Sequence, residues 1–435
     1  DGSYLDTTAD IGTLRFEHDF NARVSIRNQA RYANYGRDAR ITEAKLAGTP
    51  TLTTPLSQMT VTRNQIAVNS TESFLDDQLD LTVRFRTGSV EHSVVTGLEA
   101  GRETSAPTRF AWANVPGASL LNPDPTQAFA GTATVSSQVR TAALSAAAYA
   151  LDTIHLSKRW ELTGGVRWDR FDANYTQSIG TPVAFERVDR MASWRAALVY
   201  KPSANRTLYA AAGTSFNPSA ESLSLSASTA NLPPEENRSY EAGAKVDLQG
   251  GRMSLRSALF RTQKLNAREP DPNNSLLNVL AGEQQVDGVS ADVNGQLTSR
   301  WSMLAGYTHL DARLIQSNFY PAAIGAHLAN VPANTFNFWT DYRLPKRWQI
   351  GAGGNVVASR TASSTAPFDP TTGLVKAVPG YWVFNAMASH QISEHVELQA
   401  NVYNVANREY YDQLHPGHII LGTGRSALAG LKFRF

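Results

Sequence analysis

Along most of the chain, apolar and polar side chains alternate with a period of two. Between Leu79 and Arg86, Leu, Leu, Val and Phe alternate with Asp, Thr, Arg and Arg, and the segment Val396–Tyr403 repeats the pattern. This period is typical of β-strands that present one apolar and one polar face. No long stretch carries the 3.6-residue period of an amphipathic helix, so the pattern predicts an all-β protein.

The alternating segments predict seventeen strands, at residues 13–20, 23–35, 70–87, 91–104, 138–154, 159–175, 188–201, 205–214, 238–249, 252–264, 285–298, 301–313, 334–344, 348–360, 381–391, 394–405 and 424–435. The connections between them are alternately short and long. The long ones are rich in Pro, Ser, Asn and Thr and are expected at residues 36–68, 105–136, 215–237, 265–284, 314–333, 361–379 and 406–423.

This layout favours a transmembrane antiparallel β-barrel over a soluble β-sandwich. Sandwich strands are usually about 5–6 residues long, and their loops do not sort into short and long by turn. Membrane barrels have short periplasmic turns, long extracellular loops, an apolar outside and a polar inside. The strands exceed the ~9–11 residues needed to cross, which predicts a wall projecting above the bilayer. Seven tryptophans are expected to form an aromatic girdle near strand ends: Trp160, Trp168, Trp194, Trp301, Trp339, Trp348 and Trp382.

Composition agrees with this picture. The chain has 435 residues and a net charge of +2, so no strong positive field indicates a nucleic-acid partner. The longest apolar stretch, AALSAAAYAL at 142–151, is too short for a transmembrane helix. The absence of cysteine fits either a reducing cytosol or passage through an oxidising periplasm. The chain begins at Asp1 without a visible signal peptide, so we expect a processed, trimmed or partial sequence.

Several stretches resemble the TonB-dependent siderophore receptors, the outer-membrane transporters of ferric chelates. They occur in family order: SFNPSAESL (215–223), NLPPEENRSYEAGAK (231–245), LFRTQKLNARE (259–269), GEQQVDGVSADVNGQL (282–297), NVPANTFNFWTDYRL (330–344), VPGYWVFNAMASHQI (378–392), NVYNVANREYY (401–411) and GTGRSALAGLKFRF (422–435). The segments 13–38 and 51–65 most resemble the branch for catecholate-type siderophores, with hydroxamate and other chelates left open.

The resemblance implies a larger protein than this chain. Family members begin with an N-terminal plug domain and a TonB box, followed by a barrel of twenty-two strands. Counting back from the last strand makes the segment 13–20 the sixth. Residues 1–435 are therefore expected to be a single domain, the C-terminal part of the barrel, without the plug, the box and the first strands. Seventeen antiparallel strands would leave both sheet edges unpaired.

The function implied is import of ferric siderophores, with energy from the TonB–ExbB–ExbD system acting through the missing N-terminal region. The location implied is the outer membrane of a Gram-negative bacterium, in contact with its lipid. Iron would travel within the siderophore, so no cofactor is expected. A passive porin-like channel is the alternative, and a soluble binding or adhesion protein is a third.

A ferric catecholate is bulky, anionic and aromatic, so its site is expected to offer cations and aromatic faces. Candidates in loops or at strand ends are Arg109, Trp112, Phe319, Tyr320, His327, Arg360, Tyr410, Tyr411, His415 and His418. Each one alone is better explained as an exposed loop residue or a girdle aromatic. The hypothesis is for the set.

Catalysis and direct metal binding are not expected. His415 and His418 lack a third ligand, and the chelator already holds the iron. The carboxylates of Asp76-Asp77 and Glu235-Glu236 are interpreted as solvated loop charges, and no G-x-S-x-G setting occurs. Charges predicted to face the interior are expected to pair across strands on a wet wall: Arg84, Arg86, Arg167, Asp169, Arg256 and Lys432.

The last strand, SALAGLKFRF, carries both faces of the predicted wall. Phe433 and Phe435 are expected to face lipid, and Lys432 and Arg434 to face the interior. The terminal Phe435 resembles the signal that the barrel assembly machinery recognises.

Overall fold

A computed structural model of the chain describes residues 3–48, 50–51, 53–124, 126–127, 131–220, 223–225, 230, 232–271, 274–364, 376–414 and 419–434. Within these residues, no helix is long and apolar enough to cross a membrane. The helical elements are three single 3₁₀ turns, η1 (Leu56–Gln58), η2 (Gln249–Gly251) and η3 (Pro321–Ala323).

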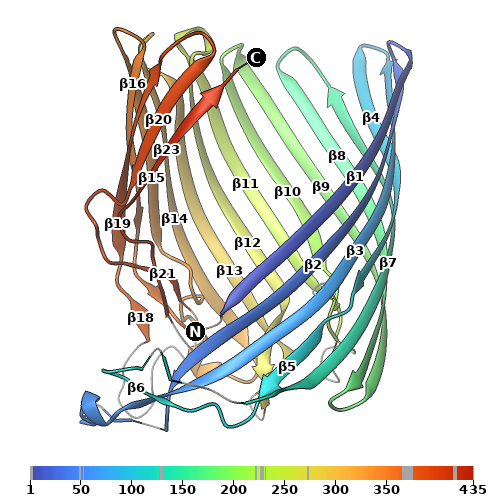
Figure 1. Ribbon diagram of the computed structural model, residues 1–435. Coiled ribbons are helices and arrows are strands. Elements are labelled where there is room, and N and C mark those ends of the chain that lie inside the picture. The colour runs from blue at the N-terminus through green and yellow to red at the C-terminus, as the bar shows by residue number, and fades with distance from the viewer. Residues whose placement is uncertain are drawn as a thin grey trace.

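The described chain forms one large antiparallel sheet in which long strands pair with their neighbours in sequence order (Figure 1). These strands are β1 (Tyr4–Asn21), β2 (Val24–Leu46), β3 (Thr60–Thr87), β4 (Val90–Ser105), β7 (Ala133–His155), β8 (Trp160–Ile179), β9 (Val183–Ser203), β10 (Arg206–Asn217), β11 (Glu235–Leu248), β12 (Met253–Asp271), β13 (Asn274–Gln296), β14 (Trp301–Ser317), β15 (Asn334–Leu344), β16 (Trp348–Val357), β19 (Tyr381–Gln391), β20 (Val396–Tyr403) and β23 (Ser426–Phe433). Each of the seventeen predicted strands coincides with one of them, which confirms the fold prediction.

Short strands lie where the long connections are: β5 and β6 extend the large sheet, and the other four form two separate two-stranded sheets. β5 (Thr108–Trp112) pairs with β3 and β7, and β6 (Ala118–Ser119) pairs with β3. β17 (Arg360–Thr361) pairs with β18 (Ala377–Val378), and β21 (Tyr411–Leu414) pairs with β22 (Ile419–Leu421). We call this end of the sheet the loop end, and the opposite end, with the tight connections, the turn end.

Two predicted loops are shorter than expected because their flanking strands continue. β2 and β3 remain paired as far as Leu46 and Val61, and β12 and β13 pair as far as Asp271 and Asn274. The predicted loops 36–68 and 265–284 were therefore wrong in extent. These extensions do not keep a regular apolar–polar alternation, but the backbone ladder continues through them, with register shifts between β12 and β13.

The strand register places the predicted apolar set on the outer surface. Val166 lies opposite Ala150 and Trp194, and 65% of its surface is exposed. The alternate residues, Arg167 and Asp169, face the interior. Large exposed apolar side chains on an outer surface are what contact with lipid requires. The buried clusters lie elsewhere, where connections fold over strand ends: one contains Val139, Ala143, Ala173, Tyr175, Ala220 and Leu225.

The predicted aromatic girdle is correct for four of its seven tryptophans. Trp160, Trp301 and Trp348 begin β8, β14 and β16, and Trp382 is the second residue of β19. The other three, Trp168, Trp194 and Trp339, lie inside their strands. The inward-facing Trp339 lies over Gly353, its partner on the next strand.

The predicted pairing of interior charges is found around Arg167 and for Arg86, which pairs with Glu91 of β4 at 3.3 Å. The guanidinium of Arg167 contacts Glu99 of β4 at 3.0 Å and Asp169 of its own strand at 2.8 Å. It also lies 5.4 Å from the ring centre of Tyr149 on β7. At the other edge, Arg434 pairs with Glu397 at 3.2 Å, and Lys432 faces the same carboxylate in register.

Inward aromatic rings lie flat against glycines on the neighbouring strand. The pairs are Tyr149 on Gly97, Tyr209 on Gly243, Phe260 on Gly288 and Trp339 on Gly353, each directly opposite in register. A Cβ on Gly288 would lie 2.2 Å from Cζ of Phe260, so a side chain there would displace the ring. Because glycine has no side chain, each ring can lie flat over the neighbouring strand and does not project into the interior.

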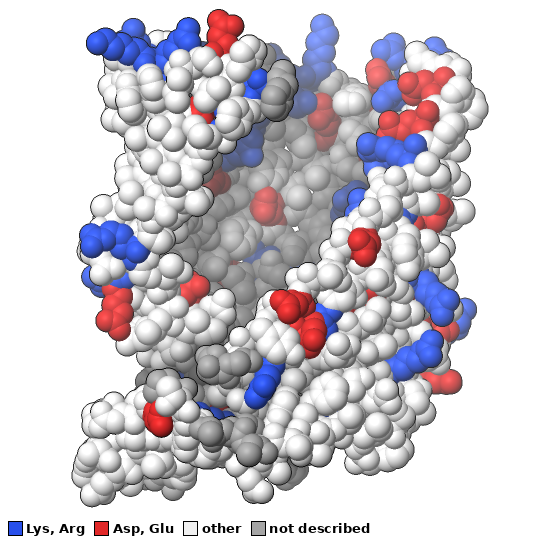
Figure 2. All heavy atoms as spheres, in the orientation of Figure 1, with Lys and Arg blue, Asp and Glu red and all other residues white. Residues whose placement is uncertain are grey.

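The wall is open on one side. Among the described residues, β1 pairs only with β2, and β23 pairs only with β20. Figure 1 shows these two strands facing each other across the front of the sheet, and Figure 2 shows the hollow interior through the gap. The two unpaired edges predicted from the strand count are present.

Candidate functional site

Three long connections at the loop end are joined into one unit, which we call the loop assembly. They are residues 318–333, 358–380 and 404–425, between β14 and β23. The guanidinium of Arg360 donates to Oδ1 of Asn330 at 3.2 Å, and the Ala329 N–H donates to Oγ of Ser364 at 2.7 Å. The first two connections are therefore held together by side chains.

Arg360 also ties the third connection to the other two. Its Nη1 donates to the carbonyl of Asp412 at 3.0 Å, and its Nη2 donates to the carbonyl of Tyr411 at 2.8 Å. The guanidinium carbon lies 5.9 Å from the ring centre of Tyr381. The fork geometry of arginine suits such cross-linking of two backbone segments. Within the described residues, its buried Nε has no hydrogen-bond partner.

The two candidate tyrosines of this assembly are packed. The ring of Tyr410 lies 4.6 Å from that of Tyr381 and covers Gly422, where a Cβ would be 2.0 Å from Cζ of Tyr410. Tyr411 packs against a buried cluster formed by Ala362, Val378 and Leu414. These contacts give both tyrosines a structural role in holding the third connection.

Asn404 and Asn407 shape that connection, and the sequence analysis missed both. Asn404 is 1% exposed, and its side chain donates to the carbonyls of Arg408 and Thr423 and accepts the N–H of Arg408 at 2.8 Å. Oδ1 of Asn407 accepts the N–H of Arg425 at 2.9 Å. Both residues have φ of 47°, a left-handed conformation that asparagine tolerates. The spacing N-V-A-N at 404–407 is a turn signal from which both could have been predicted.

The other candidates of this half lie around the end of β14. Tyr320 packs against the buried cluster of Ala312, Leu314, Ala323 and Leu328. Phe319 is 44% exposed, and His327 is also exposed while its backbone bridges to Arg313. Phe319 and His327 therefore present their side chains outward from the loop assembly.

Arg109 and Trp112 lie on a different part of the wall, on β5. Trp112 is covered by the guanidinium of Arg40 at 4.9 Å, and Arg40 in turn donates to Gln65 at 2.7 Å. Arg109 is exposed and pairs in register with Val68 and Ser137. Residues three apart on a strand face opposite sides, so Arg109 and Trp112 are separated.

His415 and His418 lie outside the described residues. In the part of the chain that the structure describes, no group of three His, Cys, Asp or Glu side chains is arranged to hold a metal ion.

A fourth connection, residues 218–234, is anchored by buried carboxylates. Asp189 on β9 is 2% exposed, pairs with Arg187 at 2.6 Å and accepts the N–H of Ser219 at 2.8 Å. Arg187 also donates to the carbonyl of Ala230. The connection thereby folds back over the inner faces of β7 and β8, where Ala220 and Leu225 are buried.

Glu235 holds the other end of this connection. It is 5% exposed, pairs with Lys264 at 2.8 Å and accepts the N–H of Arg268 at 3.0 Å. Glu235 is the first residue of β11. It lies nearer the loop end than Tyr240, which is the last large apolar side chain on the outer face of this strand, and so it lies outside the apolar band. Burial opposes its ionisation, but the bonds from Lys264 and Arg268 outweigh burial and lower the pKa of the carboxyl.

The interpretation of two acidic pairs as solvated loop charges was wrong. Glu235 is buried and ion-paired, because the residues that follow Pro233-Pro234 enter β11 at once. Asp76 and Asp77 lie within β3 rather than in a loop. Asp76 lies opposite Arg31 on the inner face of β2.

Comparison with known proteins places this arrangement among receptor barrels. Residues 1–405 match the family described as "TonB dependent receptor-like, beta-barrel". The "Probable TonB-dependent receptor BfrD" of Bordetella pertussis is 30% identical over 99% of this chain and 61% of its own length. The "Catecholate siderophore receptor Fiu" of Escherichia coli K12 is 26% identical over 96% of this chain and 59% of its own.

The three-dimensional comparison agrees. The crystal structure of the "Ferric-Catecholate import receptor Fiu" in its closed form superimposes with a TM-score of 0.89 and 25% identity, over 100% of this chain and 65% of that one. This chain thus spans about three fifths of the length of the curated relatives it matches.

The anchoring role of Glu235 predicts a pH-dependent loop. A carboxyl whose pKa is lowered by folding adds stability above its ordinary pKa of 4.5, and that stability is lost as the pH falls through the folded-state pKa. Glu235→Gln should lower the local free energy of opening of residues 217–220 and 232–235 by about 1–3 kcal/mol at neutral pH. Hydrogen–deuterium exchange, corrected for the intrinsic rate at each pH, measures this.

The neighbouring carboxyl provides the control. Glu236 makes a surface pair with Arg238 at 2.8 Å, so Glu236→Gln should change the same opening energy by less than about 0.5 kcal/mol. Equal effects of the two substitutions, or loop protection in the wild type that does not fall below pH 4.5, would contradict the anchoring role.

Proposed function

Because the chain belongs to the TonB-dependent receptor β-barrel family, we propose that it forms most of the wall of an importer of ferric siderophores, of the catecholate type. The protein lies in the outer membrane of a Gram-negative bacterium and is not an enzyme. The chelate enters from the loop end and leaves at the turn end, with energy from the TonB–ExbB–ExbD system.

The observation that carries the proposal is the likeness to the catecholate receptor of E. coli in both sequence and structure, over nearly the whole chain. The catecholate assignment rests on this relative. The geometry supports it through an open, polar interior and a set of loops fixed by side chains.

The loops divide the candidate residues between two roles. Arg360, Tyr410, Tyr411, Tyr320 and Trp112 hold the loops in place through the contacts described above. The exposed side chains, Arg109, Phe319 and His327, are then the ligand contacts, together with His415 and His418 beyond the described residues. A cation and an aromatic face suit an anionic, aromatic chelate. The iron stays within the siderophore.

A passive porin would use the same kind of wall but no energy coupling. Its solutes would pass without TonB, and its rate would rise in proportion to concentration. The relatives carry receptor names, which favours the coupled importer. Dependence on TonB separates the two functions.

The two free edges support a proposal about domain organisation. Residues 1–435 are the C-terminal part of the barrel, and an upstream region supplies a plug, a TonB box and the strands that join β1 to β23. A row of unpaired N–H and C=O groups on each edge would be costly in lipid unless paired. Within the closed barrel, β23 and the terminal Phe435 are the part that the assembly machinery recognises.

Closure is tested by expressing the chain alone and the chain extended by its upstream coding sequence. The extended form should enter the outer membrane, resist trypsin and migrate as a compact band in unheated detergent gels. The chain alone should do none of these, because its edges stay unpaired. A compact, trypsin-resistant band from the chain alone would contradict the proposal.

Transport is tested by growth of an iron-starved strain that lacks its own siderophore receptors and expresses the full-length receptor. A ferric catecholate should restore growth, a ferric hydroxamate should not, and deletion of TonB should abolish the rescue. Rescue without TonB would indicate a porin. Rescue by the hydroxamate alone would retain the importer and reject the catecholate class.

A further inference from the structure

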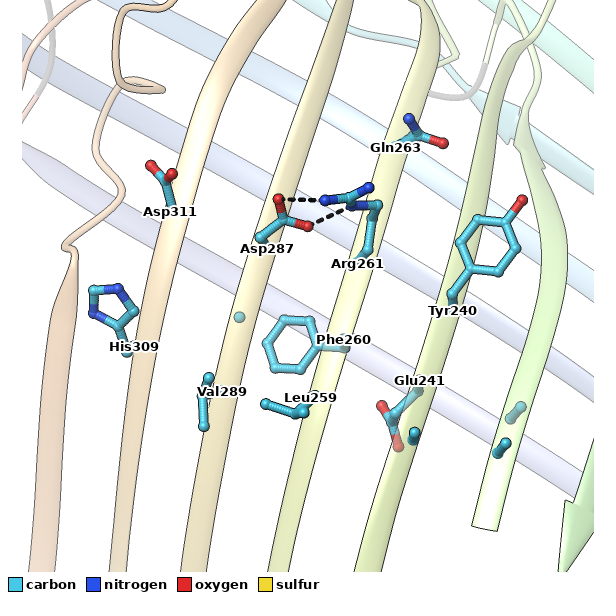
Figure 3. Close-up of a pocket in the computed structure, with 14 residues that line it drawn as sticks. Tyr240, Glu241, Leu259, Phe260, Arg261, Gln263, Asp287, Val289, His309 and Asp311 are labelled. Carbon is cyan, nitrogen blue, oxygen red and sulfur yellow. Dashed lines mark hydrogen bonds and ion pairs between the residues drawn. The ribbon is translucent and has the colours of Figure 1, made fainter.

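Two groups of charged side chains on the outer surface of the wall differ in how they are paired. The first surrounds a pocket on β10 to β14, shown in Figure 3 with the opposite wall behind it. Arg261 pairs with both carboxylate oxygens of Asp287, at 2.6 and 2.9 Å. Arg313 pairs with Asp311 at 2.7 Å. Each of these arginines has a carboxylate partner, so this patch is electrically balanced.

The second group, on β8 and β9, is not balanced. Arg170 and Arg190 lie directly opposite each other in register. They share the outer face with Trp168 and Val166. In the strand register, Trp168 lies opposite Ala192, and Val166 lies opposite Trp194. Both arginines are exposed. Like charges directly opposite on neighbouring strands are destabilising.

One carboxylate is close to this pair, and it serves only one of the two arginines. Asp172 contacts Arg170 at 3.0 Å. Among the residues that the structure describes, no carboxylate lies within ion-pair distance of Arg190. A third cation, Arg102 on β4, faces the same side of the sheet. In register it lies opposite Leu144 of β7, which in turn lies opposite Asp172 of β8. In the described part of the chain, Arg102 also has no ion-pair partner. The patch therefore carries excess positive charge.

The apolar side chains around these arginines make the unpaired charge energetically costly when the outer surface contacts lipid. Trp168, Leu144 and Val188 are 46%, 53% and 38% exposed on the same face. An arginine among lipid-facing apolar residues destabilises a barrel by an amount that rises with depth, up to about 2–4 kcal/mol at the midplane. A negatively charged group seated between the two guanidinium groups would remove both the repulsion and the unpaired charge.

We propose that the outer wall at Arg170 and Arg190 binds the phosphate of an outer-leaflet lipid headgroup. Both arginines lie nearer the loop end of β8 and β9 than Val166 and Trp194, which places them on the extracellular side of the apolar surface. The planar guanidinium matches phosphate oxygens with two parallel hydrogen bonds. The acyl chains of the lipid lie along Trp168 and Trp194. This site is separate from siderophore import and depends only on the outer-membrane location.

The test uses the receptor purified from outer membranes in a neutral detergent and measures lipid binding by native mass spectrometry. The probes are lipid A with its two phosphates, the same lipid after enzymatic dephosphorylation, and inorganic phosphate as a competitor. Lipid A should bind at least about tenfold more tightly than its dephosphorylated form, since charge-assisted bonds are lost with the phosphates. Arg170→Gln with Arg190→Gln should remove this preference.

The balanced patch supplies the matched control. Arg261→Gln with Asp287→Asn removes the same number of charged side chains from the outer surface but leaves no unpaired cation, and it should keep the preference for phosphorylated lipid. Equal binding of the two lipid forms by the wild type, or equal loss in both double variants, would overturn the proposal. Full displacement of lipid A by equimolar inorganic phosphate would also overturn it, because the site would then recognise a free anion.

Two further measurements distinguish loss of lipid binding from misfolding of a variant. Heat-induced gel mobility shows whether each variant is folded. Arg170→Lys with Arg190→Lys keeps the charge, so it should retain a preference for phosphorylated lipid even if the glutamine variant fails to fold. A folded lysine variant without any preference would contradict a charge-based site.

Discussion

The structure depends on an unbroken antiparallel hydrogen-bond ladder. Each long strand pairs with its sequence neighbour, from β1 through β23, so nearly every backbone group within the sheet has a partner without the help of water. A membrane imposes this condition because lipid offers no hydrogen bonds. Once the ladder fixes the register, alternate side chains must face lipid and interior. The two places where the ladder stops, the outer edges of β1 and β23, are therefore the main reason to expect further strands.

Above the membrane, side-chain anchors replace the ladder as the source of order. Arg360 bonds to the backbone of a neighbouring connection, and Asn404 bonds to carbonyls within its own. Asp189 accepts a backbone N–H from the connection after β10, and Glu235, at the end of that connection, accepts one from β12. Such anchors fix loop positions without continuous strand pairing. A receptor needs this, because its ligand contacts lie on loops while its wall is rigid.

The sequence predicted all the long strands, because alternation is a local signal that the membrane enforces. It did not predict where β2 and β3 end, since the residues near these ends do not keep a regular apolar–polar alternation. It also missed the burial of Glu235 and the packing of Tyr410 on Gly422, because each depends on partners distant in sequence. Arg360 was proposed from the sequence as a ligand contact, and the structure shows that its guanidinium bonds to two backbone carbonyls and the Asn330 side chain. The Arg170–Arg190 pair needed the register of two strands to become visible.

In the membrane, one face of each strand contacts lipid while the other lines a wet interior. The chain has no cysteine, so single-cysteine spin labels are readily placed on β8 at positions 166 to 169 in the receptor reconstituted in lipid. Labels at Val166 and Trp168 should collide mainly with oxygen dissolved in the bilayer, and labels at Arg167 and Asp169 mainly with a water-soluble nickel chelate. Accessibility without this period of two, or with the opposite phase, would show that the strands do not have one lipid-facing and one water-facing side.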